Sequence, residues 1–503
     1  MSRISGLRRP IRALVAITLA LVFAFSSTIL AFASVSLLQL SSDPYTNTTS
    51  QHKTEVEPDT FAFGSTIVST FQVGRFFNGG ASDIGFATST NGGKSFTNGF
   101  LPSATVNSTP PNPTYARASD PSVAFDAKHG VWIISFLGLR NPFPPVDVLV
   151  SRSTDGGLTW SAPVVVNADG DFNDKNWTVC DDTASSPFYG NCYTEFDDNT
   201  FHDLILMSTS TDGGQHWGAA QPTHNHARGI GGQPLVQPGG TVIVPIVGFT
   251  GFPSPRALIL SFISTDGGTS WSSTVKIANL LTFFEPSFIR NPDLPSAEVD
   301  ASGKVYVVWY DCRFEPGCTA NDLVLSTSTD GLNWTPITRI PIDPIGSRID
   351  HFTPGIGVDR TTSGSHTHIG LAYYYYTDPS CSTSTCNLFV GFISSTDAGT
   401  SWSQSEQLAG PMKLTWLPLT TGGYMYGDYI STSFVGSPAF PAFVVATAPT
   451  SGGSDCATAT PNCNEATYTV EGGLSVGGKG HSASDHFNAG SNDTLTGSSL
   501  TAQ

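Results

Sequence analysis

Short apolar or alternating runs recur along most of the chain, separated by polar turns rich in Gly, Asp and Ser. Three examples are DVLVSRS from Asp147, DLILMST from Asp203 and DLVLSTS from Asp322. Runs of about four to eight residues that are bounded by turn residues are typical of strands rather than helices. The pattern therefore predicts an all-β chain.

A motif of the form Ser-Thr-Asp-Gly-Gly-x-x-Trp follows these runs and marks a turn between two strands. Its copies span Ser153–Trp160, Ser210–Trp217 and Ser264–Trp271, with variants at Ser89–Phe96, Ser328–Trp334 and Ser395–Trp402. In such a turn Asp accepts backbone hydrogen bonds, Gly supplies a positive φ and Trp packs on the sheet. We interpret the third residue of each copy as structural: Asn91, Asp155, Asp212, Asp266, Asp330 and Asp397.

A second type of hairpin precedes the motif and often opens with an acidic residue or proline. Its copies begin at Glu57, Asp120, Gln233, Leu294, Thr353, Gly427 and, in a divergent form, Asn173. One such hairpin and one motif hairpin together make a four-stranded antiparallel sheet, the unit of a β-propeller blade. We predict seven blades, the last completed by the segment after Thr447 or by the N-terminus. Six blades with additional strands is the alternative.

The ends of the chain differ from the repeats. Residues 1–33 combine a basic start with an apolar stretch and a small-x-small pattern at Ala31 and Ala33, which predicts a signal peptide cleaved before Ser34. An uncleaved signal anchor is the alternative, since the stretch could span a bilayer. We expect a polar spacer over 34–54, the propeller over 55–470 and a disordered Gly/Ser-rich tail over 471–503.

Composition and net charge exclude several fold classes and kinds of binding partner. Hydrophobic residues make up 39% of the chain and charged residues only 13%, and the strong helix formers are scarce, which argues against helical and doubly wound folds. Formal charge is −17, and loss of the leader with Arg3, Arg8, Arg9 and Arg12 makes it −21. Such a charge opposes binding to nucleic acid, so we expect membrane contact only through an uncleaved anchor.

Eight cysteines occur as four close pairs. The pairs are Cys180/Cys192, Cys312/Cys318, Cys381/Cys386 and Cys456/Cys463. They lack the CxxC spacing of zinc sites, and an even number of paired cysteines in an exported chain favours disulfides. Reactive thiols are the alternative. The leader and the cysteines together predict a secreted protein, or one anchored at the cell surface.

From about Glu55 to Ala448 the chain resembles the Asp-box, or BNR-repeat, propellers, a group that includes the exo-α-sialidases. The resemblance rests on the six motif copies and implies the fold, but the same motif occurs in non-catalytic propellers. It implies a monomer acting on extracellular glycans or glycoproteins, with exo-α-sialidase-type hydrolysis as the enzymatic hypothesis. A non-catalytic propeller that binds carbohydrate or protein is the alternative.

Candidate site residues lie in loops that enter first strands or leave second strands, opposite the motif turns. The resemblance implies three arginines for a substrate carboxylate, a tyrosine nucleophile and an acidic catalyst. The Arg-Ile-Pro motif of the family is absent, so the assignment is positional. It names Arg75, Arg290 and Arg313 as the clamp, Asp83 as acid/base and Tyr426 as nucleophile.

Structural interpretations of the same loops remain open. Asp311 and Arg313 could brace a loop as an ion pair, and Asp120, Asp174 and Asp428 could cap the entries to inner strands.

Metal signals in the sequence are weak. DGDFND from Asp169 alternates acidic and amide residues as calcium loops do, but it lacks the glycine at position six and the glutamate at position twelve. Structural calcium and a solvated acidic loop both fit. The pairs His224/His226 and His366/His368 each lack a nearby third ligand. We therefore predict no metal site and no required cofactor.

Overall fold

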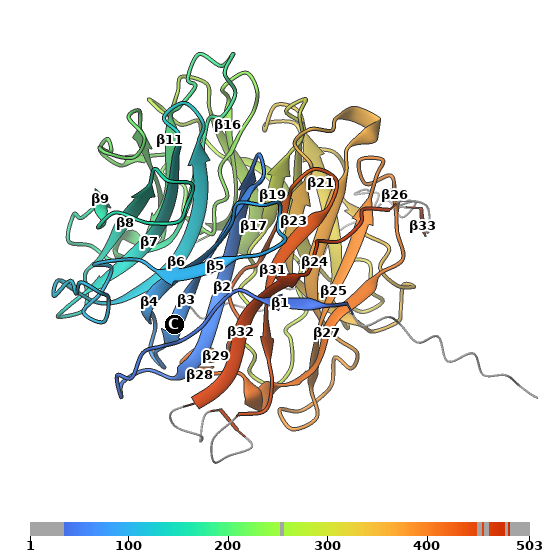
Figure 1. The fold of residues 1–503 in the computed structure, drawn as a ribbon. Helices are drawn as coiled ribbons and strands as arrows, with labels where there is room; N and C mark the ends of the chain where they lie inside the picture. The colour runs from blue at the N-terminus through green and yellow to red at the C-terminus, as the bar shows by residue number, and fades with distance from the viewer. Residues whose placement is uncertain (1–34, 252–255, 450–454, 457–461, 478–480, 483–503) are drawn as a thin grey trace, which may run out of the picture. The chain divides into compact units, whose positions relative to one another are not determined.

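A computed structural model describes residues 35–251, 256–449, 455–456, 462–477 and 481–482 (Figure 1). Its secondary structure consists of strands, apart from three 3₁₀ turns at Asn199–Phe201, Gly364–His366 and Leu414–Trp416. The prediction of an all-β chain is confirmed. The predicted leader and most of the predicted tail lie outside the described residues.

Antiparallel strands follow one another along the chain in groups that we call units 1 to 7. Unit 1 consists of β2 (His52–Phe63), β3 (Thr66–Arg75), β4 (Ala81–Ser89) and β5 (Thr97–Phe100). Unit 2 consists of β6 (Tyr115–Asp126), β7 (Val131–Arg140), β8 (Val146–Ser153) and β9 (Val164–Asn167). Unit 3 consists of β10 (Asn173–Cys180), β11 (Cys192–Asp198), β12 (Leu204–Ser210) and β13 (Gln221–Pro222). Unit 4 has two short first strands, β14 (Gly229–Ile230) and β15 (Leu235–Val236), before β16 (Val242–Thr250), β17 (Arg256–Ser264) and β18 (Val275–Asn279).

The last three units repeat the pattern. Units 5 and 6 are β19 (Ser296–Val299), β20 (Val305–Asp311), β21 (Asp322–Ser328) and β22 (Thr338–Arg339), then β23 (Asp350–Val358), β24 (Ile369–Tyr376), β25 (Asn387–Ser395) and β27 (Glu406–Lys413). Unit 7 is β30 (Ser431–Phe434), β31 (Ala439–Ala446), β32 (Asn462–Val470) and β1 (Leu37–Gln39). Two small pairs lie outside the units: β26 (Ser401–Trp402) with β33 (His481–Ser482), and β28 (Leu419–Thr420) with β29 (Gly423–Tyr424).

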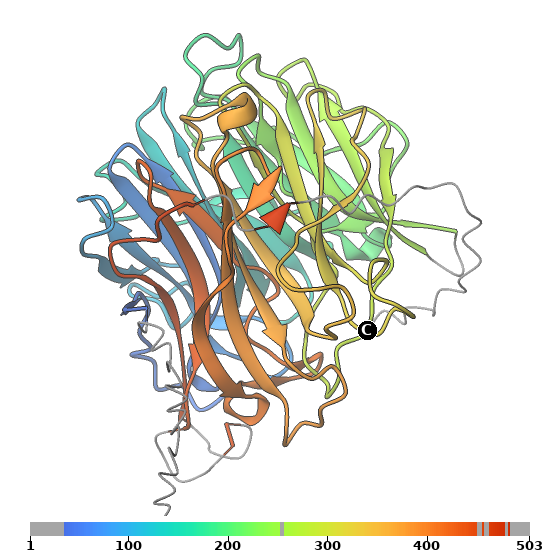
Figure 2. The ribbon, with the colours of Figure 1, turned by 90° about the vertical axis from the view of Figure 1, so that its right-hand side faces the viewer.

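The first strands of successive units contact one another. In chain order, β2, β6, β10, β15, β19, β23 and β30 each contact the next, and β30 also contacts β2. Figure 2 shows the red C-terminal strands between the blue strands of unit 1 and the orange strands of unit 6. The residues at the start of each first strand are thereby placed near one another.

Segments from both ends of the chain complete unit 7. β1 pairs antiparallel with β32, with Leu37 opposite Val470, and β2 pairs with β32 in parallel. β1 and the start of β2 thus lie within 34–54, where we expected a spacer, and Leu474 beyond residue 470 still bridges to Ala439. The segment after Thr447 and the N-terminal segment both contribute strands.

The six motif copies form turns held by their own side chains. In the copy at Asp155, Ser153 Oγ donates to Asp155 Oδ1 at 2.8 Å, and that oxygen accepts from the amides of Leu158 and Thr159 at 3.0 Å. Gly157 N donates to Ser153 Oγ at 2.9 Å. Hydrogen bonds from Thr159 lower the pKa of Asp155 to about 2, so the turn holds its acid ionised.

The two glycines of this turn give a matched stability test. Gly156 and Gly157 both have positive φ, 87° and 82°. A Cβ on Gly157 would lie 2.7 Å from Val68 Cγ2 of unit 1, whereas at Gly156 no described atom lies within 4 Å. Both alanine variants lose about 1 kcal/mol to backbone strain. We expect Gly157→Ala to lose about 1–3 kcal/mol more of the free energy of unfolding than Gly156→Ala, because its Cβ overpacks against Val68. The melting temperature of Gly157→Ala should therefore be the lower of the two. Equal losses in the two variants would contradict the contact with Val68.

Four disulfides join the predicted pairs Cys180–Cys192, Cys312–Cys318, Cys381–Cys386 and Cys456–Cys463, and the described part of the chain holds no free cysteine. The disulfide prediction is confirmed, and the pairing indicates an oxidising environment. A search of the described residues finds no helix with the length and apolar character needed to cross a membrane.

Two buried glutamates face each other where β2 meets β32. Thr54 is paired with Glu465, and the neighbouring Glu55 accepts a hydrogen bond from Ser41 Oγ at 2.9 Å. Neither oxygen of Glu465 has a hydrogen-bond partner among the described residues. Burial raises the pKa of Glu55 to about 8, and burial together with Glu55 raises the pKa of Glu465 well above its usual value.

This pair makes stability depend on pH. The folded state keeps protons that the unfolded chain releases above about pH 4.5, so stability falls by about 1.4 kcal/mol per pH unit for each retained proton as pH rises toward 8. We expect Glu465→Gln to flatten this dependence and to raise the melting temperature at pH 8. Glu471→Gln, at an exposed position bonded to Ser36, is the control. An unchanged slope in Glu465→Gln would contradict the assignment.

Candidate active site

Four first strands carry a bulge in their first half. The residues Glu57, Asp120, Lys175 and Thr353 have φ of 55°, 49°, 39° and 46°, and the strand register shifts at each of them. In three of the four the next residue is proline, which cannot donate to the sheet ladder. Bulges redirect side chains, and they are common beside active sites. Because the first strands contact one another, these positions lie at one edge of the units.

A group of charged residues, which we call the charge cluster, surrounds this edge. Its members are Glu57, Arg75, Asp120, Asp174, Arg290 and Asp428. Arg290 Nε donates to Asp428 Oδ1 at 2.7 Å, and Nη2 donates to the other oxygen of that carboxylate. Arg75 donates from Nη1 to Gln72 Oε1 at 2.7 Å. Burial and the charge of Arg290 lower the pKa of Arg75.

The carboxyl groups of the cluster differ in protonation. Burial opposes ionisation of Asp428, yet its ion pair with Arg290 holds its pKa below the usual value. Burial and then Asp120 raise the pKa of Asp174 to about 7, and burial with Asp120 and Asp428 raises the pKa of Glu57 well above its usual value. At neutral pH an ionised carboxylate therefore stands beside carboxyl groups that can donate a proton, the division of roles that acid–base catalysis requires.

The cluster is partly open to solvent. The Arg290 side chain is 30% exposed and that of Asp428 10%, whereas Arg75 is 2% exposed and Glu57 fully buried. Gly422, beside the β28–β29 pair, lies against Arg290, since a Cβ there would be 3.3 Å from Arg290 Cδ. A ligand therefore reaches Arg290 and Asp428 before it reaches Arg75.

The structure brings together two of the five residues in the positional assignment, Arg75 and Arg290. Asp83 lies on β4, a third strand, where its Oδ2 accepts from Tyr45 Oη at 2.5 Å. Arg313 forms a two-point ion pair with Asp311, at 2.8 and 2.7 Å. Both residues have partners outside the charge cluster, and the interpretation of Asp311 and Arg313 as a bracing pair matches this geometry.

Tyr426 is fully buried beside the cluster. Its hydroxyl is 2.5 Å from Thr353 Oγ1 and donates to Asn291 Oδ1 at 3.2 Å. Glu285 is close enough to add to the effect of burial, and the pKa of Tyr426 lies well above its usual value. The hydrogen-bond partners of the tyrosine hydroxyl are thus Thr353 and Asn291, and the tyrosine is in its protonated form. Its role as nucleophile stays a prediction.

Glu57 is a cluster residue that the sequence assignment missed, and Asp120, Asp174 and Asp428 were interpreted only as caps. Asp428 pairs with Arg290 rather than with the amides of its own loop. An acidic residue followed by proline occurs in the first strand of two units, in EPD from Glu57 and DPS from Asp120. This repeated pair was the signal in the sequence that could have located the charge cluster.

The acidic segment from Asp169, whose sequence fits both structural calcium and a solvated loop, brings carboxyl groups together in the structure. Asp169, Asp171 and Asp198 each offer a carboxylate oxygen, and these oxygens lie within 4.8 Å of one another. Asp169 also accepts from Asp171 N at 3.0 Å and from Asn167 Nδ2 at 2.8 Å. Calcium at this loop stays a prediction.

Comparisons with known proteins give one partial sequence match. No family model matches the chain. A protein named sialidase from Bacteroides fragilis (strain YCH46) is 29% identical over 172 residues, which cover 29% of this chain and 29% of that protein. The chain therefore spans less than a third of the curated relative that it matches.

Several solved structures are similar at low identity. A leech intramolecular trans-sialidase is 12% identical, with 67% of each chain covered and a TM-score of 0.44. A polysaccharide lyase described as an ulvan lyase is 10% identical, with coverage of 86% and 96% and a TM-score of 0.49. An α-L-arabinofuranosidase from Fusarium graminearum is 12% identical, with coverage of 68% and 93% and a TM-score of 0.42.

Proposed function

We propose that this protein is a carbohydrate-active, sialidase-like propeller that hydrolyses the terminal glycosidic bond of an acidic sugar, as an exo-α-sialidase does. One observation carries the proposal: Arg290 holds the Asp428 carboxylate by two hydrogen bonds in the same cluster as Arg75 and Asp174. Burial raises the pKa of Asp174 to about 7, which suits a proton donor. The partial match to a sialidase supports the same substrate class.

The proposed architecture is a closed propeller of seven blades with Asp-box turns. Seven units, each with one or two first strands that contact those of the next, support seven blades over six. The repeated Ser–Asp hydrogen bonds, as at Ser153 and Asp155, support the Asp-box interpretation of the motif. The charge cluster then lies at the end of the propeller axis away from those turns.

In the proposed reaction each cluster residue has a separate task. Arg290, with Arg75 behind it, attracts the carboxylate of the sugar. Asp174 donates a proton to the glycosidic oxygen as its bond to the anomeric carbon breaks. The Asp428 carboxylate stabilises the positive charge that develops on the sugar ring. Water then adds to the anomeric carbon and gives a proton to the Asp174 carboxylate, which restores the acid. Asp174 replaces Asp83 as the proposed acid because it lies in the cluster.

A non-catalytic glycan- or protein-binding propeller is the second candidate. The two-point bond from Arg290 to Asp428 and the 2% exposure of Arg75 favour it, since both arginines are already engaged. Such a protein would bind acidic glycans without turnover.

A panel of fluorogenic glycosides separates the two candidates. The full mature chain is incubated with α-sialosides, β-glucuronides and matched neutral glycosides, and binding to acidic and neutral glycans is measured in parallel. Turnover confined to acidic glycosides supports the enzyme, and binding without turnover supports the second candidate. If the protein neither turns over nor binds acidic glycans, both candidate functions are wrong.

We further propose that the protein is exported, monomeric and active without a cofactor on extracellular glycans or glycoproteins, with calcium serving only as a structural ion at Asp169, Asp171 and Asp198. The four disulfides support an extracellular setting.

A further inference from the structure

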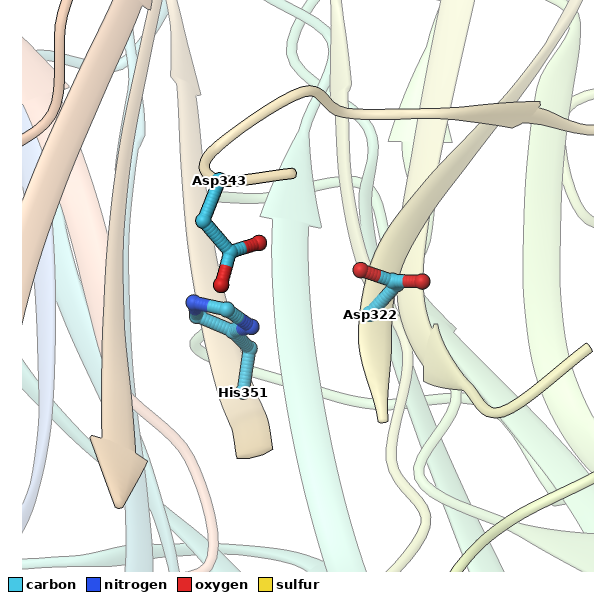
Figure 3. A group of neighbouring side chains, drawn as sticks. All are labelled: Asp322, Asp343 and His351. Carbon is cyan, nitrogen blue, oxygen red and sulfur yellow. The ribbon is translucent and has the colours of Figure 1, made fainter. Parts of the chain in front are cut away.

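Asp322, Asp343 and His351 form a second polar group, between units 5 and 6 (Figure 3). Asp322 begins β21, Asp343 lies in the segment after β22, and His351 is the second residue of β23. One oxygen from each carboxylate and one imidazole nitrogen lie within 4.8 Å of one another. Figure 3 shows Asp322 facing Asp343 and His351 from the opposite side. Three different segments therefore supply ligand-type atoms to one point.

The group is buried. The Asp322 side chain is 2% exposed, that of Asp343 11%, and His351 1%. Arg339 Nε donates to Asp322 Oδ1 at 2.7 Å and Nη2 donates to Asp343 Oδ1 at 2.8 Å. Ser347 Oγ donates to the remaining oxygen of Asp343 at 2.5 Å. Hydrogen bonds thus orient both carboxylates, as the outer ligands of metal sites commonly do.

A third carboxyl group, that of Glu315, lies near this group. Glu315 is 4% exposed and close enough to act electrostatically on Asp322, and its Oε1 accepts from Gly346 N at 2.8 Å. Asp322 Oδ2 and Glu315 Oε2 are both buried, and nothing in the described part of the chain hydrogen-bonds to them. A buried carboxylate oxygen without a partner is costly unless it is protonated or meets a cation.

We propose that Asp322, Asp343 and His351 bind a divalent transition-metal ion of the zinc class. Calcium and magnesium take oxygen ligands, whereas one imidazole with two carboxylates suits Zn²⁺ and its neighbours in the first transition row.

The role of this ion is structural. It ties the segment between β22 and β23 to the start of β21 and so joins unit 5 to unit 6. The site does not include the charge cluster, and the proposal is independent of the proposed function.

The test uses the full mature chain, stripped with chelator and titrated with ZnCl₂, with affinity measured by calorimetry and Co²⁺ followed by visible absorption. We expect one Zn²⁺ per chain, a higher melting temperature with zinc, and d–d bands of bound Co²⁺. His351→Gln should weaken zinc binding by about 100-fold or more, and Asp343→Asn by about 10–100-fold. Asp343 is the more exposed of the ligands, so Asp343→Asn provides the deciding measurement in the event that His351→Gln does not fold.

His368→Gln is the matched control. His368 Nδ1 lies 3.9 Å from Asp359 Oδ2, and in the described residues neither belongs to a group of three ligands. The His368→Gln variant should bind zinc with the same affinity as the wild type. A stoichiometry below 0.2 per chain, or equal affinity in Asp343→Asn and the wild type, would overturn the proposal.

Discussion

Replacing Arg290 with Gln is expected to lower kcat/KM for an acidic glycoside by about 10²–10⁴-fold, because it removes both the exposed guanidinium and the partner that keeps Asp428 ionised. Asp428 Oδ1 and Oδ2 both accept from Arg290, and the Asp428 side chain is only 10% exposed. Without that ion pair its pKa rises, and the developing positive charge on the sugar loses its stabilising carboxylate. Steady-state kinetics on the acidic glycoside measures the loss.

Arg313→Gln is the control for this prediction. Arg313 also forms a two-point pair with a buried aspartate, Asp311, and its side chain is 7% exposed, so the two variants remove similar ion pairs. We expect Arg313→Gln to reduce stability and leave kcat/KM within about threefold of the wild type, since it lies outside the cluster. If both variants abolish turnover, the three-arginine assignment from the sequence is the better one, and if only Arg313→Gln does, neither assignment holds.

The fold was predictable because its signals are local. Each motif copy encodes a turn whose hydrogen bonds stay within about seven residues, as Ser153, Asp155 and Thr159 illustrate. Close cysteine pairs such as Cys312 and Cys318 likewise needed no knowledge of distant contacts. By contrast, the partner of β1 is β32, more than 420 residues away, and no local pattern specifies which distant strand it joins.

The site was less predictable because bulges and the packing between units determine which side chains come together there. Arg75 and Arg290 come from units that are far apart in sequence, and only the contact of first strands with one another brings them together. Asp83 was assigned from a loop position, but β4 begins at Ala81 and carries it into a third strand. Tyr426 lies next to the cluster yet packs against Tyr374, with ring centroids 4.2 Å apart.

The bulges also explain why acidic residues are tolerated at this edge. A first strand that continued its regular pleat would alternate its side chains between the two faces of its sheet. The positive φ at Glu57 and Asp120 breaks that alternation and directs both carboxyl groups to the same place. Backbone strain at these positions is therefore coupled to the cluster.

Replacing Asp174 with Asn is expected to remove the proton donor and to lower kcat by about 10²–10⁴-fold for glycosides with poor leaving groups. Glycosides with good leaving groups, which need no protonation, should keep most of their rate. In the wild type, activity should fall as pH rises through about 7, where Asp174 loses its proton, and the variant should lack that limb. Rate–pH profiles on a matched pair of leaving groups measure both effects.

Stability gives a second readout for Asp174 that does not depend on turnover. Its pKa is raised by burial and Asp120, so the folded state retains a proton between about pH 3.8 and 7 that the unfolded chain releases, and stability falls as pH rises across that window. Asp174→Asn should reduce this slope, which thermal unfolding measured at several pH values will show. If Asp174→Asn changes neither the slope nor the dependence on leaving group, Asp174 is not the acid. If the slope changes alone, Asp174 titrates as described but does not transfer a proton to the substrate.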